Sequence, residues 1–254
     1  MSDVIQINEQ FYILATSGLA DERTRVLKYG KMFAVFDRYG DIEVVGLGQQ
    51  GIFHEGTRFL SRLVFRISQS RPLLLSSAVR EDNSVLTIDL SNLDVDVDGQ
   101  VVVPRGSVYV ARSKFLWKGV CYEQFKISNY SLSSLQVPVS IQFDADFADI
   151  FEVRGTKRER RGQRLPDIVK DGAVTLVYAG LDGVERRTKL RCSPQPSVTS
   201  GSEFQFTLSL EPGAETDILL SIACEIGSSS YEVQRYERAL VAAENQITEI
   251  KNQS

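Results

Sequence analysis

Four carboxylates and three phenylalanines stand close together between residues 143 and 155. Asp144 and Asp146 are two positions apart, which places them on one face of a β-strand with their Cα atoms about 6.7 Å apart. Two carboxylates about 5 Å or roughly 6.5–9.5 Å apart can hydrolyse glycosidic bonds. That chemistry also requires a cleft and two different pKa values. Because Asp residues on the solvent face of a sheet are common, the pair alone does not predict catalysis.

The acidic spacing changes after Phe147, where Asp149 and Glu152 follow. A strand must therefore bulge, turn or end there, and its carboxylates are aimed differently afterwards. A concentrated basic run comes next. We interpret it as charge compensation for the acidic segment, or as a solvated loop, in preference to a polyanion site. The run consists of Arg154, Lys157, Arg158, Arg160, Arg161 and Arg164.

Residues 46–51 have the glycine spacing of a dinucleotide-binding turn. Such a turn must be followed by a helix and a parallel strand, whereas this stretch leads into more β pattern. Residues 94–99 imitate the opening of a calcium loop. The twelfth position of that loop is Arg105 where a bidentate Glu is needed, so a hairpin turning at Asp98-Gly99 is favoured.

His54 is the only histidine, and the three cysteines show no paired spacing. These counts argue against zinc sites and nucleophilic triads, so we expect no metal and no cofactor. His54 lies beside Glu55, but a surface or hydrogen-bonded histidine in a loop is the more frequent outcome. The odd number of cysteines predicts buried thiols in a reducing compartment.

The chain has 254 residues, 43% of them hydrophobic and 24% charged, and a net charge of -4. This composition is that of a globular protein with no general attraction to nucleic acid. Residues 1–10 are polar, and no run approaches the roughly 20 apolar residues of a membrane helix. We therefore expect a cytoplasmic protein that binds neither nucleic acid nor membrane.

Hydrophobic residues alternate with period two along most of the chain, which predicts a large antiparallel β protein. Two packed sheets are the natural way to bury so many strands. The expected strands are 25–36, 42–45, 63–67, 73–79, 85–97, 101–103, 108–116, 120–129, 135–143, 173–179, 185–191, 204–210 and 215–223.

The end of the chain changes to spacings of three and four, which predict an amphipathic helix. Ser228, Ser229 and Ser230 are candidate N-caps. We expect a β-sandwich domain at 1–227 and a linker helix at 228–254. The narrow apolar stripe fits either a partner domain or the helix's own sheet. Its members are Val233, Tyr236, Leu240, Ala243, Ile247 and Ile250.

Several short motifs together resemble the N-terminal domain of bacterial glycogen-debranching (amylo-α-1,6-glucosidase-like) proteins. The most specific is DFADIFEVRG at 146–155, and the resemblance spans most of residues 11–225. One departure is Gly56, where the family usually has an acidic residue before Thr-Arg. The other motifs are GIF at 51–53, TRFLSR at 57–62, PLLLSS at 72–77 and NYS at 129–131.

The resemblance implies a β-supersandwich that precedes a helical (α/α)6 barrel, with the general acid and base in the barrel. No catalytic residue is carried over to this chain. The implied role is to support or position an α-glucan for that glycosidase domain. Residues that would face the glucan or the neighbouring domain are Thr57, Arg58, Arg62, Trp117, Asp146, Asp149, Glu152 and Arg154.

Two alternatives remain open. A free-standing carbohydrate-binding module would stack exposed aromatic rings on sugar faces, with Trp117, Tyr109 and Tyr122 as candidates. Exposure of Trp117 would favour that function, and its burial would favour a structural role. A complete hydrolase would need a pocket around Asp144 and Asp146.

Overall fold

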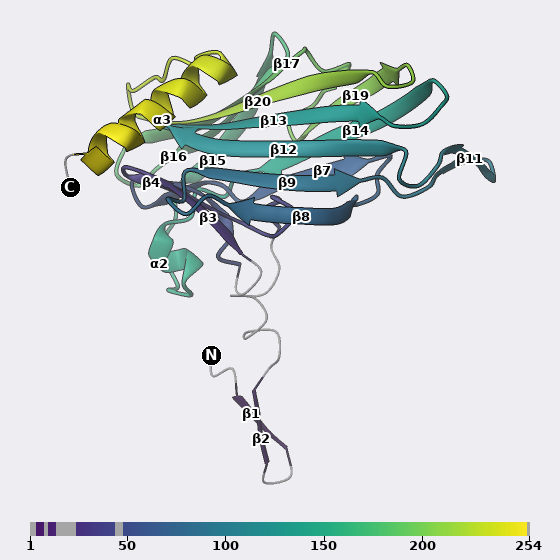
Figure 1. Cartoon of the computed structure of the whole chain (residues 1–254). Helices are drawn as coiled ribbons and strands as arrows, with labels where there is room; N and C mark the ends of the chain where they lie inside the picture. Colours follow the sequence, from purple (N-terminus) through teal and green to yellow (C-terminus); the bar gives the residue numbers. More distant parts are fainter. Residues whose placement is uncertain (1–3, 8–9, 14–23, 44–47, 253–254) are drawn as a thin grey trace.

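The largest element of the structure is a sheet of eight antiparallel strands (Figure 1). The computed structural model describes residues 4–7, 10–13, 24–43 and 48–252, and it places side chains within 24–43 and 48–246. In order across the sheet, the eight strands are β15 (Gln163–Lys170), β16 (Ala173–Ala179), β17 (Glu185–Ser193), β20 (Glu215–Ile226), β13 (Val120–Asn129), β12 (Val108–Trp117), β9 (Val85–Ser91) and β8 (Leu73–Val79).

Two four-stranded antiparallel sheets form the opposite layer, so the predicted all-β sandwich is confirmed with one layer divided. One sheet contains β18 (Val198–Thr199), β19 (Glu203–Leu210), β14 (Leu135–Asp144) and β7 (Arg62–Ile67). The other contains β3 (Arg25–Tyr29), β4 (Met32–Phe36), β5 (Gly51–His54) and β6 (Thr57–Leu60). The remaining elements are the hairpins β1 (Val4–Ile7) with β2 (Gln10–Ile13) and β10 (Val95–Val97) with β11 (Gln100–Val103), and the helices α2 (Ile150–Val153) and α3 (Tyr236–Asn252).

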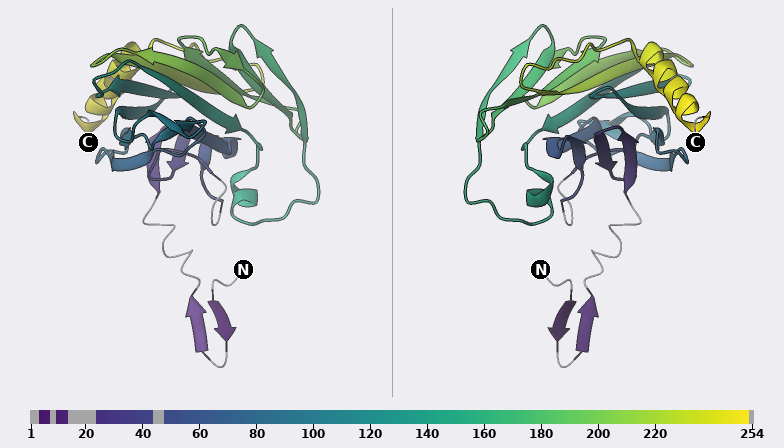
Figure 2. Two further views of the ribbon diagram at one scale, coloured as in Figure 1. Left: turned by 90° about the vertical axis from the view of Figure 1, so that its right-hand side faces the viewer. Right: turned by 90° about the vertical axis from the view of Figure 1, so that its left-hand side faces the viewer.

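The core lies where the eight-stranded sheet arches over the smaller sheets (Figure 2). Alternate residues of each strand face this space, because successive side chains of a strand point to opposite faces. The ring of Phe65 on β7 stacks on Phe125 of β13 with 4.9 Å between centroids. Thr188 Oγ1 on β17 donates a hydrogen bond to the carbonyl of Phe59 on β6 at 2.5 Å. The large sheet therefore packs against both smaller sheets.

Four buried charges form a network inside this core, which the sequence pattern does not predict. Glu123 accepts hydrogen bonds from Arg112 Nε at 2.8 Å and Lys114 Nζ at 2.6 Å. Arg112 Nη1 also donates to Asp41 Oδ1 at 2.7 Å. Each of these side chains is at most 1% exposed. Because hydration of a buried ion is lost at a cost of several kcal/mol, each charge depends on the opposite charges around it.

Two long predicted strands are wrong, since each is interrupted. The 25–36 segment turns at Gly30, which has a φ of +54° and separates β3 from β4. The 85–97 segment breaks at the fully buried Asn92. Its side-chain amide donates to the carbonyls of Leu93 and Pro104, both at 2.7 Å, and its oxygen accepts the Val108 N–H at 2.8 Å. These bonds replace the strand ladder with a loop.

The predicted hairpin at Asp98-Gly99 is confirmed, because β10 pairs with β11 across it. Asp96 Oδ1 accepts the Gly99 N–H at 2.8 Å, and Asp94 Oδ1 accepts the Arg105 N–H at 2.7 Å. These oxygens thus stabilise the turn. Of the glycine motif at 46–51, residues 46–47 lie outside the described residues, and β5 follows where a dinucleotide turn needs a helix.

Helix α3 begins at Tyr236, so the prediction that Ser228, Ser229 or Ser230 caps it is wrong. Ser229 instead closes a turn, donating from its hydroxyl to the Ile226 carbonyl at 2.6 Å. The helix packs on the outer face of the eight-stranded sheet, over β12 and β13 (Figure 1). Its buried side chains there are Tyr236, Ala239 and Ala243, while the side chains of Ile247 and Ile250 lie outside the described residues.

All three cysteines are buried and free, as the sequence predicts. Burial raises the pKa of Cys121 to about 12 and raises those of Cys192 and Cys224 as well. The thiols therefore stay protonated near neutral pH and pack as small apolar groups. In the described part of the chain, no helix has the length and hydropathy needed to cross a membrane.

Candidate functional site

Strand β14 ends at Asp144, and the chain then turns into the single-turn helix α2. Phe147 has a φ of +50°, a left-handed conformation that is rare for a bulky residue. Asp149 Oδ1 accepts the N–H groups of Phe151 at 2.8 Å and Glu152 at 3.1 Å. Glu152 Oε2 accepts the Asp149 N–H at 3.0 Å, completing a capping box. The predicted end of the strand and re-aiming of its carboxylates are confirmed.

Backbone hydrogen bonds join this turn to the distant strand β6. The Arg58 N–H donates to the Ala148 carbonyl at 2.8 Å, and the Ile150 N–H donates to the Gly56 carbonyl at 2.9 Å. These bonds hold the Thr-Arg motif beside the acidic motif. Two segments that are almost ninety residues apart in sequence therefore form one surface.

Arg58 fixes Asp146 behind that surface. Its Nε donates to Asp146 Oδ1 at 3.1 Å, and its Nη2 bonds the second carboxylate oxygen. Its Nη1 donates to the carbonyls of Gly48 at 2.6 Å and Gln50 at 3.1 Å. A Cβ at Gly51 would lie 2.5 Å from Arg58 Cδ, so only glycine lets the arginine cross there. Arg58 is thus a largely buried positioning residue.

Three of the six basic residues compensate the acidic segment, so the first of the two interpretations from the sequence is confirmed for that part of the run. Arg161 also donates through Nη2 to the Asp146 carbonyl at 2.8 Å. The ion pairs hold the loop after α2 against the turn before it. They are Arg158 with Asp149 at 2.6 Å, Arg161 with Glu152 at 3.0 Å and Arg164 with Asp144 at 3.7 Å.

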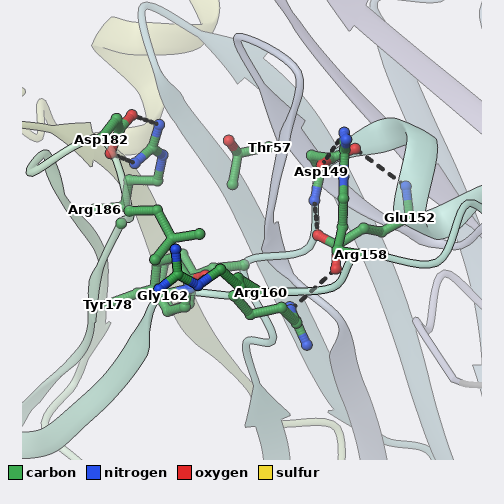
Figure 3. Close-up of a pocket in the computed structure, with 13 residues that line it drawn as sticks. Thr57, Asp149, Glu152, Arg158, Arg160, Gly162, Tyr178, Asp182 and Arg186 are labelled. Atoms are coloured by element: carbon green, nitrogen blue, oxygen red, sulfur yellow. Dashed lines mark hydrogen bonds and ion pairs between the residues drawn. The ribbon is translucent and has the colours of Figure 1, made fainter.

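An open groove of about 410 Å³ lies between this region and the turn that joins β16 to β17. Figure 3 shows Thr57 between two groups of ion pairs, with the Asp182 pair on one side and the Asp149 pair on the other. Aromatic stacking closes part of the wall, since Phe147 and Tyr178 lie 5.3 Å apart at 10°. The lining residues are Thr57, Phe147, Asp149, Glu152, Arg158, Arg160, Arg161, Gly162, Tyr178, Gly180, Leu181, Asp182 and Arg186.

Asp182 and Asp149, two of the carboxylates that line the groove, have lowered pKa values. Hydrogen bonds from Arg186 lower the pKa of Asp182 to about 2. Burial alone would raise the pKa of Asp149, but the Glu152 and Phe151 N–H groups and Arg158 together lower it. A general acid must carry its proton near neutral pH. Neither carboxylate meets that requirement.

Replacing Arg186 with alanine is expected to raise the pKa of Asp182 from about 2 toward its ordinary value of 3.8. The guanidinium donates to both carboxylate oxygens, at 3.1 and 2.8 Å, and so favours the charged form. Carbon-13 NMR of the carboxyl group during a pH titration measures the shift. Arg154→Ala, which removes an equal charge outside the groove, is the control and should leave the midpoint near 2. An unchanged midpoint in R186A would contradict this assignment.

The structure gathers some of the predicted site residues and separates others. Thr57, Asp149 and Glu152 line the groove, with Arg58 and Asp146 behind it. The remaining three do not line it. Arg154 is exposed at the C-cap of α2, Arg62 is exposed and bonds Gln142 Oε1 at 2.7 Å, and Trp117 lies beneath α3.

The aromatic candidates for sugar stacking are covered. Trp117 is 5% exposed and Tyr122 is 2% exposed, both in the cluster beneath α3. Tyr109 is half-buried and donates its hydroxyl to Asp89 at 2.5 Å. Trp117 is therefore buried, the outcome that favours a structural role for it. Aromatic residues in strands pack wherever a helix or a second sheet covers that face.

The Asp144 and Asp146 pair lacks the setting of a glycosidase. Arg164 and Arg58 pair with them, and neither carboxylate lines the groove. His54 lies in β5, not in a loop; it is buried, and its Nε2 lies 3.0 Å from the Tyr231 hydroxyl. Burial lowers its pKa. Within the described residues, no group of three His, Cys, Asp or Glu side chains could hold a metal ion.

Half of the groove comes from residues that the sequence did not single out. Tyr178, Asp182 and Arg186 are brought there by the β16–β17 hairpin. The turn signal at Asp182-Gly183 and the four-residue spacing of Asp182 and Arg186 are visible in the sequence. Their position beside α2 is not visible in the sequence. It depends on the pairing of β15 with β16 at the sheet edge, and the sequence pattern does not predict β15.

Comparison with known proteins gives one family. The N-terminal domain of some glycogen debranching enzymes matches residues 27–221. No curated protein sequence matches the chain.

Solved structures of similar fold include proteins with different assigned activities. A human-microbiome protein assigned as a kojibiose phosphorylase superposes with a TM-score of 0.57 at 9% identity, over 89% of this chain and 33% of that one. The chain thus spans about a third of that protein's length. An Escherichia coli K12 protein assigned as an aldose 1-epimerase superposes with a TM-score of 0.44 at 11% identity, over 80% of this chain and 98% of that one. A galactose mutarotase related enzyme from Lactobacillus acidophilus superposes with a TM-score of 0.44 at 11% identity, over 84% of this chain and 100% of that one. At these identities the likeness concerns the fold alone.

Proposed function

We propose a non-catalytic role for this chain, which belongs to the family of N-terminal domains found in some glycogen debranching enzymes. In this role the chain supports or positions an α-glucan for a helical-barrel glycosidase domain. We assign that partner to the amylo-α-1,6-glucosidase type of glycoside hydrolase, acting in the cytoplasm. The observation that carries the proposal is that the motifs at 57–62 and 146–155 meet at one groove. Thr57 on β6 pairs with Asp149 at the cap of α2.

The charges of the groove favour positioning over catalysis. Its three carboxylates are each paired with an arginine, so their charges are compensated and their orientations are fixed. A glycosidase acid needs a raised pKa instead. Fixed polar groups at the mouth of a groove suit orientation of hydroxyl-rich ligands or contact with a neighbouring domain.

A free-standing carbohydrate-binding module is the competing function, and the aromatic residues argue against it. Sugar stacking needs an exposed ring face. Tyr178 is the half-buried aromatic of the groove, and Phe147 already stacks on it at 5.3 Å. We therefore expect the groove alone to bind glucan weakly.

Calorimetric titration with an α-1,6-branched malto-oligosaccharide tests this proposal. We expect no saturable heat up to millimolar ligand, which means a binding free energy weaker than about -4 kcal/mol. In the presence of a debranching-type barrel domain, the chain is expected to lower the KM for the same glucan. An unchanged KM would contradict the positioning role. Saturable binding by the isolated chain that Thr57→Val weakens would identify a carbohydrate-binding module instead.

A further inference from the structure

The charges that line the groove do not cancel. Four arginines and three carboxylates line it, and three of the arginines are paired with the three carboxylates. Within the described residues, the Arg160 side chain makes no ion pair and no hydrogen bond. The groove therefore keeps one uncompensated positive charge. The pairs are Arg158 with Asp149 at 2.6 Å, Arg161 with Glu152 at 3.0 Å and Arg186 with Asp182 at 2.8 Å.

Two hydroxyl groups of the groove also have a proton free to donate. The Tyr178 hydroxyl accepts the Gly162 N–H at 2.7 Å, so its own proton is left to donate elsewhere. The Thr57 hydroxyl has no hydrogen-bond partner among the described residues. The carboxylate oxygens, by contrast, already accept bonds from arginines and backbone amides. The groove is therefore complementary to a ligand group that accepts hydrogen bonds and carries negative charge.

We propose that this groove binds a phosphate monoester carried by a sugar, with Arg160, Thr57 and Tyr178 as its donors. A phosphate group offers three terminal oxygens as acceptors and a charge that Arg160 can pair with. A neutral sugar would leave the Arg160 charge uncompensated. The volume of about 410 Å³ exceeds what a phosphate fills and leaves room for a hexose ring. This site goes beyond the positioning of neutral glucan proposed above.

Titration calorimetry of the whole chain at low salt tests the site with glucose 6-phosphate, inorganic phosphate and glucose as probes. We expect saturable binding of glucose 6-phosphate, weaker binding of phosphate and none of glucose. Arg160→Ala is expected to weaken glucose 6-phosphate binding at least tenfold. Arg154→Ala is the matched control, because it removes an equal charge from an exposed arginine that does not line the groove. R154A should bind like the unchanged chain.

Three results would overturn the proposal. These are absence of saturable binding, retention of binding in R160A, and equal weakening in R160A and R154A, which would indicate diffuse surface charge. A further titration with a phosphorylated malto-oligosaccharide distinguishes the two sources of the phosphate. Tighter binding than glucose 6-phosphate assigns the site to a phosphorylated glucan, and equal or weaker binding assigns it to a free sugar phosphate. These outcomes are separate from those with neutral glucan, so either proposal can fail alone.

Discussion

Replacing Glu123 with glutamine is expected to lower the free energy of unfolding by about 3–5 kcal/mol. The Glu123 carboxylate is fully buried and bonds both Arg112 and Lys114. Without its charge, two buried cations would share Asp41, which directly bonds Arg112. Loss of one partner leaves a buried charge uncompensated, and that cost exceeds the value of the pair itself.

Urea unfolding followed by circular dichroism measures this effect. The matched control is Lys126→Ala on the same strand, since Lys126 pairs with Glu215 in solvent, with side chains 43% and 56% exposed. Exposed pairs contribute little to stability, so K126A should unfold near the urea midpoint of the unchanged chain. A loss in E123Q no larger than that in K126A would show that the network does not stabilise the core.

A double replacement separates the charges from the packing. Lys114→Met with Glu123→Leu removes one cation and one anion and leaves the Arg112–Asp41 pair intact. Its loss of stability is expected to be smaller than the sum of the two single losses, because the residues form one network. Additive losses would instead assign the effect to side-chain volume.

The sequence pattern predicts the bounds of several strands but not the buried charge network. Strands 73–79, 120–129 and 173–179 are predicted with the bounds that the structure has, because alternation is a local signal. Alternation assigns charged residues to the solvent face, however. Arg112 and Lys114 lie in phase with Val108 and Val110, on the core side. The two buried cations are tolerated on the core side because Asp41 and Glu123 pair with them. This pairing depends on the tertiary structure and is not visible in the local sequence.

The candidate site divides in the same way. The turn and the cap at Asp149 follow from the acidic spacing, which is local. The contributions of Tyr178 and Arg186 depend on the order of strands at the sheet edge. Pairing of distant strands is set by the whole core and leaves no signature in a short stretch of sequence. Trp117 shows the same limit, since its burial depends on where α3 docks.

Deleting residues 236–254 is expected to shift the fluorescence of Trp117 to longer wavelength and to lower solubility. Trp117 is the only tryptophan, so the tryptophan emission reports the environment of this one side chain. Without α3, a continuous apolar patch would face water, and such patches promote association. The cluster beneath the helix comprises Val85, Phe115, Trp117, Val120, Tyr122 and Ala223, and the helix contributes Tyr236, Ala239 and Ala243.

A single substitution tests the same contact without shortening the chain. Tyr236 is 5% exposed and its ring lies 5.2 Å from that of Phe115, so Tyr236→Ala should cost about 3–5 kcal/mol of stability. The control Tyr236→Phe keeps the ring and loses only the 3.3 Å bond to the Ser113 carbonyl, at a cost of about 0.5–1.5 kcal/mol.

The emission of Trp117 decides what the helix is for. Unchanged emission and melting temperature after the deletion would contradict docking on this domain and favour a connector held by a partner. A red shift with lowered stability would mean that the first turns of α3 belong to the β-sandwich. Any linker toward a barrel domain would then begin beyond Ala243, the last of the helix residues buried in the cluster. The family resemblance implies a linker, and the packing shows that α3 is docked. Both hold if the linker begins beyond Ala243.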